Sequence, residues 1–299
     1  MPTYDNVVIF GASGAVGSAA ALRAHTDGAK VSLAMRDTSK SVTNLHGFPF
    51  ERFQADLTQP DTIKAAVCRT GAKAAFIYAV FGAPDHMRPA IRALKESGIE
   101  FVVFLSSFTI MTTIRAVPSA DVIAHHHAQI EIVLEEELGP ESFVAVRPSY
   151  FASNVLQHSI GIKKGEVRLP NPDAVFDFIS PNDIGTVAGA LLTSGQRVRM
   201  VGLLGPERLS LRDAIGIVGT ALGKTITVMG ISEDEAVTQM VKSGISPSLV
   251  KWVVQNVVHR PHYFFENPDA STAIDNIQKY SSNTPERFQQ WVENNKDRF

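Results

Sequence analysis

Three glycines near the start of the chain restrict its fold more than any other feature. Gly11 and Gly14 lie between an apolar run over 7–10 and an alanine-rich stretch over 15–25, and Gly17 lies at the start of that stretch. A strand, a glycine turn and a helix in this order let the backbone approach a diphosphate, which binds the free amides at the helix N-terminus. The middle glycine stands one residue later than in the common G-x-G-x-x-G form. The pattern still predicts a dinucleotide-binding turn, lined by Gly11, Ser13, Gly14, Ala15, Val16 and Gly17.

Short apolar runs alternate with helix-like stretches through the first 150 residues. The runs have the length of buried strands, and the stretches between them have helical character. This alternation predicts an α/β fold with a doubly wound parallel sheet of the Rossmann type, joined by right-handed crossovers. The expected strands are 7–10, 31–35, 48–53, 74–80, 101–105 and 143–147, and the expected helices are 15–25, 58–69, one carrying Met87, Ile91 and Leu94, and 120–138 with Ser119 as its cap.

The pattern beyond residue 150 is less regular. It predicts strands over 175–179 and 198–203, a helix over 183–192, and mainly helical chain over 209–222, 233–242, 247–258 and 285–295. Thr284 and Pro285 have the residue types of a helix cap and first position. We expect a dinucleotide-binding domain from residues 1–155 with 175–204, and a smaller, mostly helical lobe from residues 156–174 and 205–299.

The composition excludes several classes of protein. Hydrophobic residues make up 44% of the 299 residues, charged residues 19%, and the net charge is −2. These values are typical of a globular protein and leave no excess of cations for nucleic acid. Cys68 is the single cysteine, so no intrachain disulfide forms, and no apolar stretch reaches the roughly 18 residues of a membrane helix. We expect a cytoplasmic monomer or homodimer that binds a small-molecule substrate.

The end of the second expected strand indicates which dinucleotide binds. The strand contains no acidic residue to hold a ribose 2′-hydroxyl, and Arg36 stands where a guanidinium can bind a 2′-phosphate. Ser13 and Lys40 are placed to assist it. In the alternative, Arg36 is a solvated surface residue and Asp37 binds the ribose. We interpret the pattern as favouring NADP over NAD.

Two further strand ends carry candidate contacts to the dinucleotide. Asp56 and Leu57 follow the third expected strand, where an adenine would lie. Asp56 either accepts from the exocyclic amine or caps the next turn. Phe81 and Gly82 end the fourth strand and are expected beneath the nicotinamide, because Gly82 permits close backbone approach.

Together these motifs resemble the NmrA-like family of atypical short-chain dehydrogenases. The resemblance covers nearly the whole chain, and it rests on residues 11–17, Arg36-Asp37, Ala55-Asp56-Leu57, Arg147-Pro148-x-x-Phe151-x-x-Asn154, Asp183-Ile184-Gly185, Leu204-Gly205-Pro206 and residues 285–299. It implies a Rossmann-type domain bound to NADP(H) and a smaller substrate lobe. It also implies that the chain is a reductase of small molecules or quinones, or a redox-sensing regulator without catalysis.

The sequence departs from the superfamily at its usual catalytic pair. Most members use Tyr-x-x-x-Lys, in which the lysine lowers the pKa of the tyrosine. None of the five tyrosines here has a lysine four residues later. Many NmrA-like reductases keep a lysine four residues before a glutamate. The resemblance matches Glu131 to that glutamate and places His127 at the lysine position.

His127 ends a run of three histidines, His125-His126-His127. Adjacent residues cannot share one helical face, so we expect no metal site from this run. On the expected helix, His127 shares an apolar stripe with Ile123 and Ile130. It either donates a proton, holds the nicotinamide ribose, or is simply packed or exposed.

Polar residues at the ends of the fifth and sixth strands complete the predicted site. Ser106 and Ser107 end the fifth strand, at the edge where open α/β sheets bind ligands. The resemblance implies that a serine here binds the reacting oxygen of the substrate, and we favour Ser107. Simple capping of strand-end amides is the alternative. The predicted catalytic residues are Ser107, His127 and Tyr150, and the predicted substrate contacts are Phe81, Phe108, Tyr150, Asn154, Phe176 and Trp252.

The missing tyrosine–lysine pair favours acceptors that need little help from a proton donor. We expect an NADPH-dependent reductase of a small, largely apolar electrophile, such as an imine, an iminium ion, an activated alkene or a quinone. Two alternatives stay open. One is a non-catalytic sensor of NADP(H), and the other is a non-redox iminium cyclase of the Pictet–Spengler type.

Overall fold

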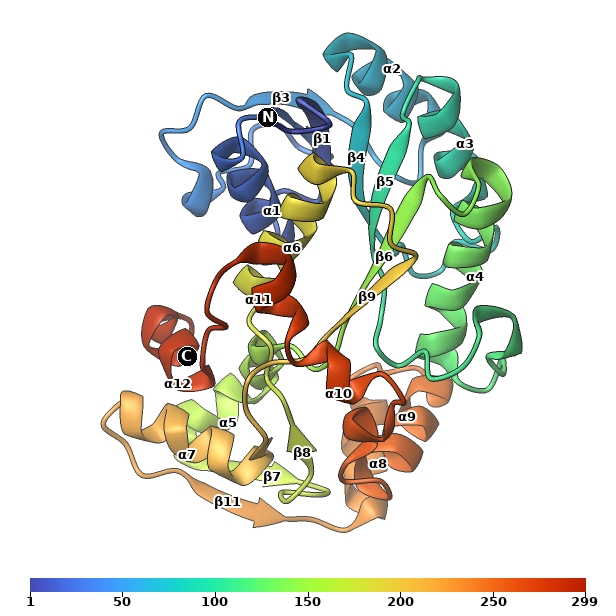
Figure 1. The fold of residues 1–299 in the computed structure, drawn as a ribbon. Coiled ribbons are helices and arrows are strands. Elements are labelled where there is room, and N and C mark those ends of the chain that lie inside the picture. The colour runs from blue at the N-terminus through green and yellow to red at the C-terminus, as the bar shows by residue number, and fades with distance from the viewer.

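The computed structural model describes residues 1–299, and its centre is one sheet of seven parallel strands. Their order is β3-β2-β1-β4-β5-β6-β9, so the direction of winding reverses between β1 and β4 (Figure 1). In open α/β sheets, ligands bind outside the carboxyl ends of the strands at this point. The strands are β1 (Asn6–Phe10), β2 (Lys30–Met35), β3 (Glu51–Gln54), β4 (Ala74–Tyr78), β5 (Phe101–Leu105), β6 (Phe143–Pro148) and β9 (Met200–Leu203).

Helices cover both faces of the sheet, as a doubly wound fold requires. One face packs against α1 (Ala15–Thr26), α6 (Pro181–Ser194) and α11 (Asn276–Ser281), and the other against α2 (Pro60–Thr70), α3 (Arg88–Glu96) and α4 (Val122–Leu138). All strands except the edge strand β3 are buried between two apolar clusters, which explains why they form continuous apolar runs in the sequence. The predicted fold class is confirmed.

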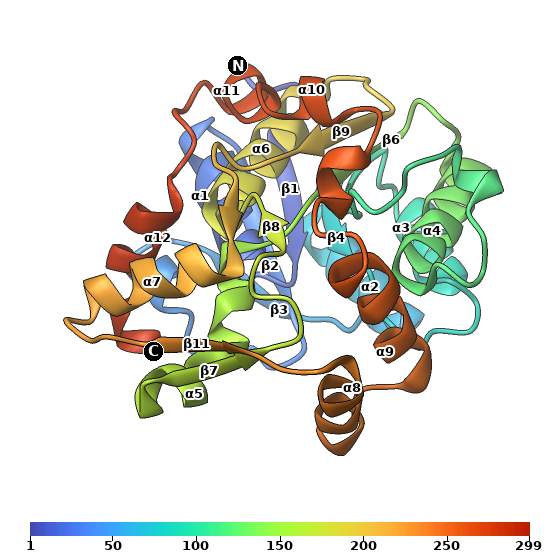
Figure 2. The same cartoon turned by 90° about the horizontal axis from the view of Figure 1, so that it is seen from below.

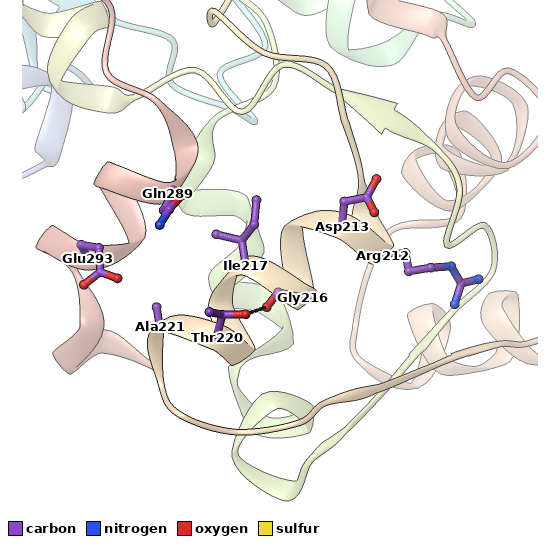
Figure 3. A pocket seen from close by; sticks show the side chains of 8 residues that line it. All are labelled: Arg212, Asp213, Gly216, Ile217, Thr220, Ala221, Gln289 and Glu293. Carbon is purple, nitrogen blue, oxygen red and sulfur yellow. Dashed lines mark hydrogen bonds between the residues drawn. The ribbon is translucent and has the colours of Figure 1, made fainter.

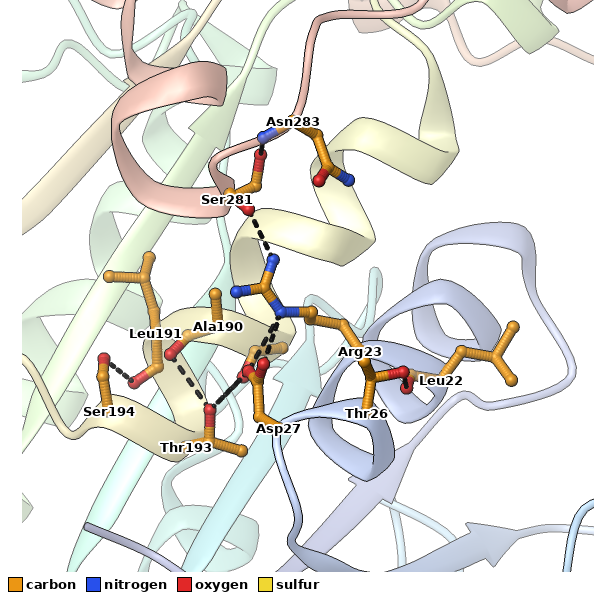
Figure 4. Close-up of polar contacts among 11 residues, drawn as sticks. Leu22, Arg23, Thr26, Asp27, Ala190, Leu191, Thr193, Ser194, Ser281 and Asn283 are labelled. Carbon is orange, nitrogen blue, oxygen red and sulfur yellow. Dashed lines mark hydrogen bonds and ion pairs between the residues drawn. The ribbon is translucent and has the colours of Figure 1, made fainter. Parts of the chain in front are cut away.

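Two glycines let α6 cross α1 at very close range. A Cβ atom at Gly185 would lie 2.3 Å from the carbonyl oxygen of Val16, and one at Gly189 would lie 2.6 Å from that of Ala20. Polar contacts secure the same crossing (Figure 4). The Thr193 hydroxyl of α6 donates to Asp27 of α1 at 2.9 Å. Arg23 pairs with Asp27 at 2.8 Å and donates from Nη1 to the carbonyl of Ser281 in α11 at 2.7 Å. The position of α1, and so of its N-terminus, therefore depends on residues from the second half of the chain.

A second group of elements shares its own apolar core of 18 buried residues, and we call this group the small lobe. Figures 1 and 2 show it beyond the carboxyl ends of the strands. Two small two-stranded sheets, β8–β10 and β7–β11, lie among its helices. Its elements are η3 (Ala152–His158), α5 (Ser159–Lys164), β7 (Glu166–Leu169), β8 (Val175–Phe176), β10 (Leu209–Ser210), α7 (Leu211–Ala221), β11 (Thr227–Gly230), α9 (Pro247–Val253), η5 (Tyr263–Glu266) and α12 (Phe288–Asn294).

The remaining elements are short or peripheral. They are η1 (Thr43–Leu45), η2 (Ile114–Ala116), α8 (Glu233–Lys242), the π-helical turn η4 (Val254–Val258), α10 (Ala270–Ala273) and η6 (Lys296–Arg298). None of the helices is both long enough and apolar enough to cross a lipid bilayer.

Four local expectations were wrong, two of them because a distant segment takes the backbone partners. The expected strand 175–179 does not join the main sheet, since β8 pairs antiparallel with β10. Ser119 does not cap α4, which begins at Val122 without a side-chain cap. Thr284 and Pro285 do not start the last helix, because the Glu286 amide donates to Asp183 and the Phe288 amide to Glu207. The expected helix 247–258 changes to a π-helical turn at 254.

The division into two domains stays a prediction, with one amendment from the packing. We expected all of residues 205–299 to belong to the substrate lobe. Helix α11 instead returns to the sheet, where Ile277 joins the core beneath α1 and α6.

Candidate functional site

The glycine turn has the geometry that the sequence pattern predicts. Gly11 follows β1 with φ +74°, and a Cβ atom there would lie 2.7 Å from the ring of Tyr78. A Cβ at Gly17 would lie 2.4 Å from the carbonyl oxygen of Gly11, so the turn tolerates no side chain at either position. Gly14 provides no side-chain cap for α1, and the first turn of α1 contains no acidic residue. The positive end of the helix dipole is therefore free to bind an anion.

Two adjoining depressions lie along this turn and share Gly11, Ser13 and Tyr78. The first, which we call the strand-end hollow, has a volume of about 40 Å³. The second, the loop cleft, has a volume of about 440 Å³. The strand-end hollow is lined by Phe10, Gly11, Ala12, Ser13, Ala34, Met35, Arg36, Ala55, Leu57 and Tyr78, and the loop cleft by Gly11, Ser13, Gly14, Ala15, Val16, Gly17, Phe76, Tyr78, Leu105, Phe151, Ser153, Pro181 and Arg298.

Arg36 is exposed at the strand-end hollow and makes no ion pair, so its guanidinium is available to a ligand. The Asp37 side chain forms local hydrogen bonds instead. Its carboxylate accepts hydrogen bonds from the amide and the hydroxyl of Ser39 at 2.9 and 2.6 Å, and these bonds lower its pKa. Lys40 does not line the hollow. Of the two interpretations of this strand end, the geometry favours Arg36 as the ligand contact.

Asp56 and Leu57 lie together beyond β3 but have different roles. The Oδ1 atom of Asp56 accepts from the amide and the hydroxyl of Thr58, both at 2.8 Å. The carboxylate thereby closes a local turn. Leu57 is buried and forms part of the hollow. The apolar surface for an adenine ring thus comes from Leu57, while Asp56 is committed to the turn.

Phe81 and Gly82 lie past β4, outside both depressions. Phe81 is 64% exposed and stacks on His126 with ring centroids 4.4 Å apart. No protein atom lies within 4 Å of a Cβ built on Gly82, and its approach to a nicotinamide stays a prediction. Tyr78, at the end of β4, lines both depressions next to the glycine turn, and the sequence analysis missed it.

His127 is buried on α4, and burial lowers its pKa to about 4. Its Nδ1 atom lies 2.9 Å from the carbonyl oxygen of Ile123. A carbonyl only accepts, so Nδ1 carries the proton and Nε2 of the neutral ring is an acceptor. His127 is therefore a poor proton donor near neutral pH and is suited to accept from a hydroxyl. The neighbouring His126 is half-buried, and burial also lowers its pKa.

The fifth and sixth strands end in a buried ion pair. Glu131 of α4 accepts from both sides of the Arg147 guanidinium, at 2.9 and 2.6 Å, and from the hydroxyl of Ser106 at 2.5 Å. Ser106 therefore faces the core. Ser107 points the other way along the strand end and contacts Thr109 through their hydroxyls at 2.9 Å. This alternation supports Ser107 over Ser106 as the ligand contact.

Tyr150 and Phe176 are neighbours, with ring centroids 3.9 Å apart, and Phe176 is buried in the core of the small lobe and not free to contact a substrate. Burial raises the pKa of Tyr150, whose hydroxyl accepts from Gln157 at 3.2 Å, so the phenol stays protonated and free to donate. Asn154 is exposed on η3. No hydrogen bond joins Ser107, His127 and Tyr150, so they do not form a connected catalytic relay.

Phe108 and Trp252 are not free to contact a substrate. Phe108 is 1% exposed and packs with Leu204 and Ala273 against the sheet edge. Trp252 belongs to the core of the small lobe, and its indole donates to Asp121 at 2.6 Å. Phe108 and Trp252 were predicted as substrate contacts from their residue type alone, but both side chains point into apolar clusters of the protein.

A buried carboxylate that the sequence analysis missed joins three segments near this edge. Asp177 accepts from Ser149, from the amide of Tyr150 at 3.1 Å and from the amide of Gly205 at 2.6 Å. Burial raises its pKa to about 6 despite these bonds. It fixes the backbone that carries Tyr150. The only sequence signal connected with Asp177 was the Leu204-Gly205-Pro206 turn, whose Gly205 amide donates to it.

Another groove, between α7 and α12, is as large as the loop cleft at about 440 Å³ (Figure 3). Its lining is largely polar, with two hydrophobic residues among eight, and it shares none of them with the glycine turn. We therefore place the candidate site at the strand-end hollow and the loop cleft.

The sheet, its switch point and the glycine turn define a Rossmann-type α/β protein. The chain belongs to the NmrA-like family, whose model matches residues 3–279. The resemblance found in the sequence is thereby confirmed.

The relatives of known description include a regulation-like protein and several reductases. The chain is 42% identical over 234 residues to the nitrogen metabolite regulation-like protein bik4 of Gibberella fujikuroi, which covers 74% of this chain and 70% of that one. It is 25% identical over 253 residues to an NAD(P)H azoreductase of Xenophilus azovorans, covering 81% and 83% of the two chains.

Solved structures share the fold at low sequence identity. A quinone oxidoreductase of Escherichia coli, solved with NADPH, superposes with a TM-score of 0.75 at 16% identity, covering 96% of this chain and 99% of that one. The negative transcriptional regulator NmrA superposes with a TM-score of 0.71 at 16% identity, covering 97% and 95%. The same architecture thus occurs in a reductase and in a regulator.

Proposed function

We propose that this protein binds NADPH and reduces a small, largely apolar electrophile. The observation that carries the proposal is the pair of depressions along the glycine turn, with Arg36 unpaired at one end. The free N-terminus of α1 suits a diphosphate, Leu57 suits an adenine, and the guanidinium suits a 2′-phosphate. The azoreductase and the quinone oxidoreductase are relatives whose names describe the same kind of reaction.

When bound, NADPH supplies a hydride from C4 of the nicotinamide to an electrophilic carbon. The protein's own residues offer little proton transfer. Neutral His127 accepts rather than donates, which suits it to hold a ribose hydroxyl, and burial keeps the Tyr150 phenol protonated. Ser107 and Tyr150 are left to orient the substrate through hydrogen bonds.

This lack of a proton donor narrows the substrate class. A hydride added to a cationic iminium carbon gives a neutral amine, so the charges balance without any proton. A quinone or an activated alkene spreads the new negative charge and takes its proton from water. An ordinary ketone would need an acid at the reacting oxygen. We therefore place an iminium or similar delocalised cation first among the acceptors.

The test is a spectrophotometric assay with NADPH and one representative of each class: an iminium, a quinone, an activated alkene and a ketone. Loss of nicotinamide absorbance with the first three, and not with the ketone, is the expected result. Binding of NADPH without turnover of any acceptor would reject the reductase proposal.

A regulatory role is the second candidate, favoured by the description of the bik4 relative and by the missing proton donor. A sensor would bind NADP⁺ and NADPH with different affinities and would change conformation or oligomeric state between them. Equal affinities and an unchanged sedimentation profile would remove this candidate.

A further inference from the structure

The charges around the two depressions are all of one sign. Their combined lining contains no aspartate or glutamate, and its only cations are Arg36 and Arg298. Arg36 stands at the strand-end hollow. Arg298 stands at the loop cleft, among the residues of the glycine turn, although it comes from η6 at the other end of the sequence.

Arg298 has no anionic partner within the protein. Its only polar side-chain contact is a hydrogen bond from Nη1 to the Oδ1 atom of Asn295 at 3.2 Å. Most other arginines on the surface pair with carboxylates, as Arg287 does with Glu207 at 2.8 Å. An exposed guanidinium beside free helix amides, with no acid to neutralise it, suits an anionic ligand.

The packing of the small lobe fixes where Arg298 stands. Its amide donates to the carbonyl of Asn295, whose side chain in turn donates to the carbonyl of Trp291 at 2.8 Å. Phe299 packs edge-on against Trp291, with ring centroids 6.4 Å apart. Trp291 is 4% exposed in the core of the small lobe. These contacts hold the backbone of Arg298 against the small lobe, so its side chain extends from a packed segment.

We propose that Arg298 binds the diphosphate of the dinucleotide at the loop cleft. This inference rests on the proposed function and adds to it a binding residue that belongs to the small lobe. Amides of the glycine turn and α1 contribute partial charges, and Arg298 adds a full charge with a planar, two-pronged donor set. The ligand's phosphates then connect the small lobe to the sheet, and Arg36 is left to the 2′-phosphate.

The experiment titrates the full chain with NADPH, NADH and adenosine 2′,5′-bisphosphate by calorimetry. The variants are Arg298→Ala, Arg298→Lys and Arg36→Ala, with Lys296→Ala as the matched control. Lys296 carries the same charge two residues away, pairs with Glu293, and lines neither depression. Circular dichroism checks that each variant is folded.

Arg298→Ala should weaken NADPH and NADH by the same factor, roughly 5- to 20-fold for one exposed charge-assisted contact. The affinities of Arg298→Lys should lie between those of Arg298→Ala and the parent. The bisphosphate lacks a diphosphate bridge, so its affinity should fall less than that of the nucleotides in Arg298→Ala. Arg36→Ala should weaken NADPH and the bisphosphate but spare NADH. Lys296→Ala should bind all three as the parent does.

Three outcomes would overturn the inference. Arg298→Ala could bind both nucleotides with the affinity of the parent. It could instead lose affinity for NADPH alone, which would show that Arg298 binds the 2′-phosphate. Lys296→Ala could lose as much nucleotide affinity as Arg298→Ala, which would show that the loss comes from the change in net charge and not from a specific contact. A parent protein that binds neither nucleotide would instead overturn the proposed function, so the two failures are distinguishable.

Discussion

Replacing Gly185 by alanine tests whether the close crossing of α6 over α1 is required. The new Cβ would lie 2.3 Å from the Val16 carbonyl oxygen and 2.5 Å from the Ala19 Cβ. Nonbonded carbons prefer about 3.5–4.0 Å, so the two helices must separate by about 1 Å. Overpacking of this kind costs about 1–3 kcal/mol.

A matched control separates this cost from helix propensity. Gly216 lies within α7, and no atom comes within 4 Å of a Cβ built there. Alanine is favoured over glycine inside helices by about 1 kcal/mol, and that gain applies to both substitutions. We therefore expect Gly216→Ala to stabilise the protein and Gly185→Ala to destabilise it, with a difference between them of about 1–3 kcal/mol.

The assay is urea unfolding of both variants, with calorimetric titration of NADPH alongside. Because α1 carries the anion-binding amides, Gly185→Ala should also weaken NADPH several-fold, while Gly216→Ala should leave binding unchanged. Equal stability of the two variants would refute the argument that the crossing admits no side chain. Unchanged NADPH affinity in a destabilised Gly185→Ala would refute the link from α6 to the site.

Three further predictions concern single side chains. Arg36→Ala should lower the ratio of NADPH to NADH affinity about 10-fold or more, measured by titration, and an unchanged ratio would refute the specificity assignment. Glu131→Gln leaves the Arg147 guanidinium buried without a counter-charge and should cost about 3–5 kcal/mol in urea unfolding, whereas replacing both residues by apolar ones should recover part of that loss; equal losses would contradict this account. Asp177 has a folded pKa of about 6, above its unfolded value, so its contribution to stability is full below the unfolded pKa and disappears as the pH rises through 6. Unfolding free energies measured between pH 4 and 7 should therefore fall less steeply with rising pH in Asp177→Asn than in the parent, and parallel profiles would show that burial does not raise this pKa.

The strand–turn–helix unit could be predicted because its determinants are local. The apolar run, the three glycines and the alanine-rich helix are contiguous, and each residue's neighbours in sequence are also its neighbours in space. The same reasoning predicted the buried strands, since a strand covered on both faces has to be apolar throughout.

The rest of the site depends on contacts between segments far apart in the sequence. Asp177 gathers donors from two other segments, and no spacing in the sequence announces them. Arg298 reaches the glycine turn only through the packing of Trp291. Phe108 was misjudged because residue type does not reveal which way a side chain faces once regular strand alternation ends.

The order of assembly follows from the α1–α6 crossing. Helix α1 is synthesised early, yet the surface that holds it is completed only by residues of α6 and by the Ser281 carbonyl, which receives Arg23. A ribosome-bound chain that has emerged only as far as β6 therefore lacks the contacts from α6 and Ser281 that hold α1 and its glycine turn in place. Affinity for a nucleotide should appear late in translation, and a truncated first half would make a poor biosensor or fusion module.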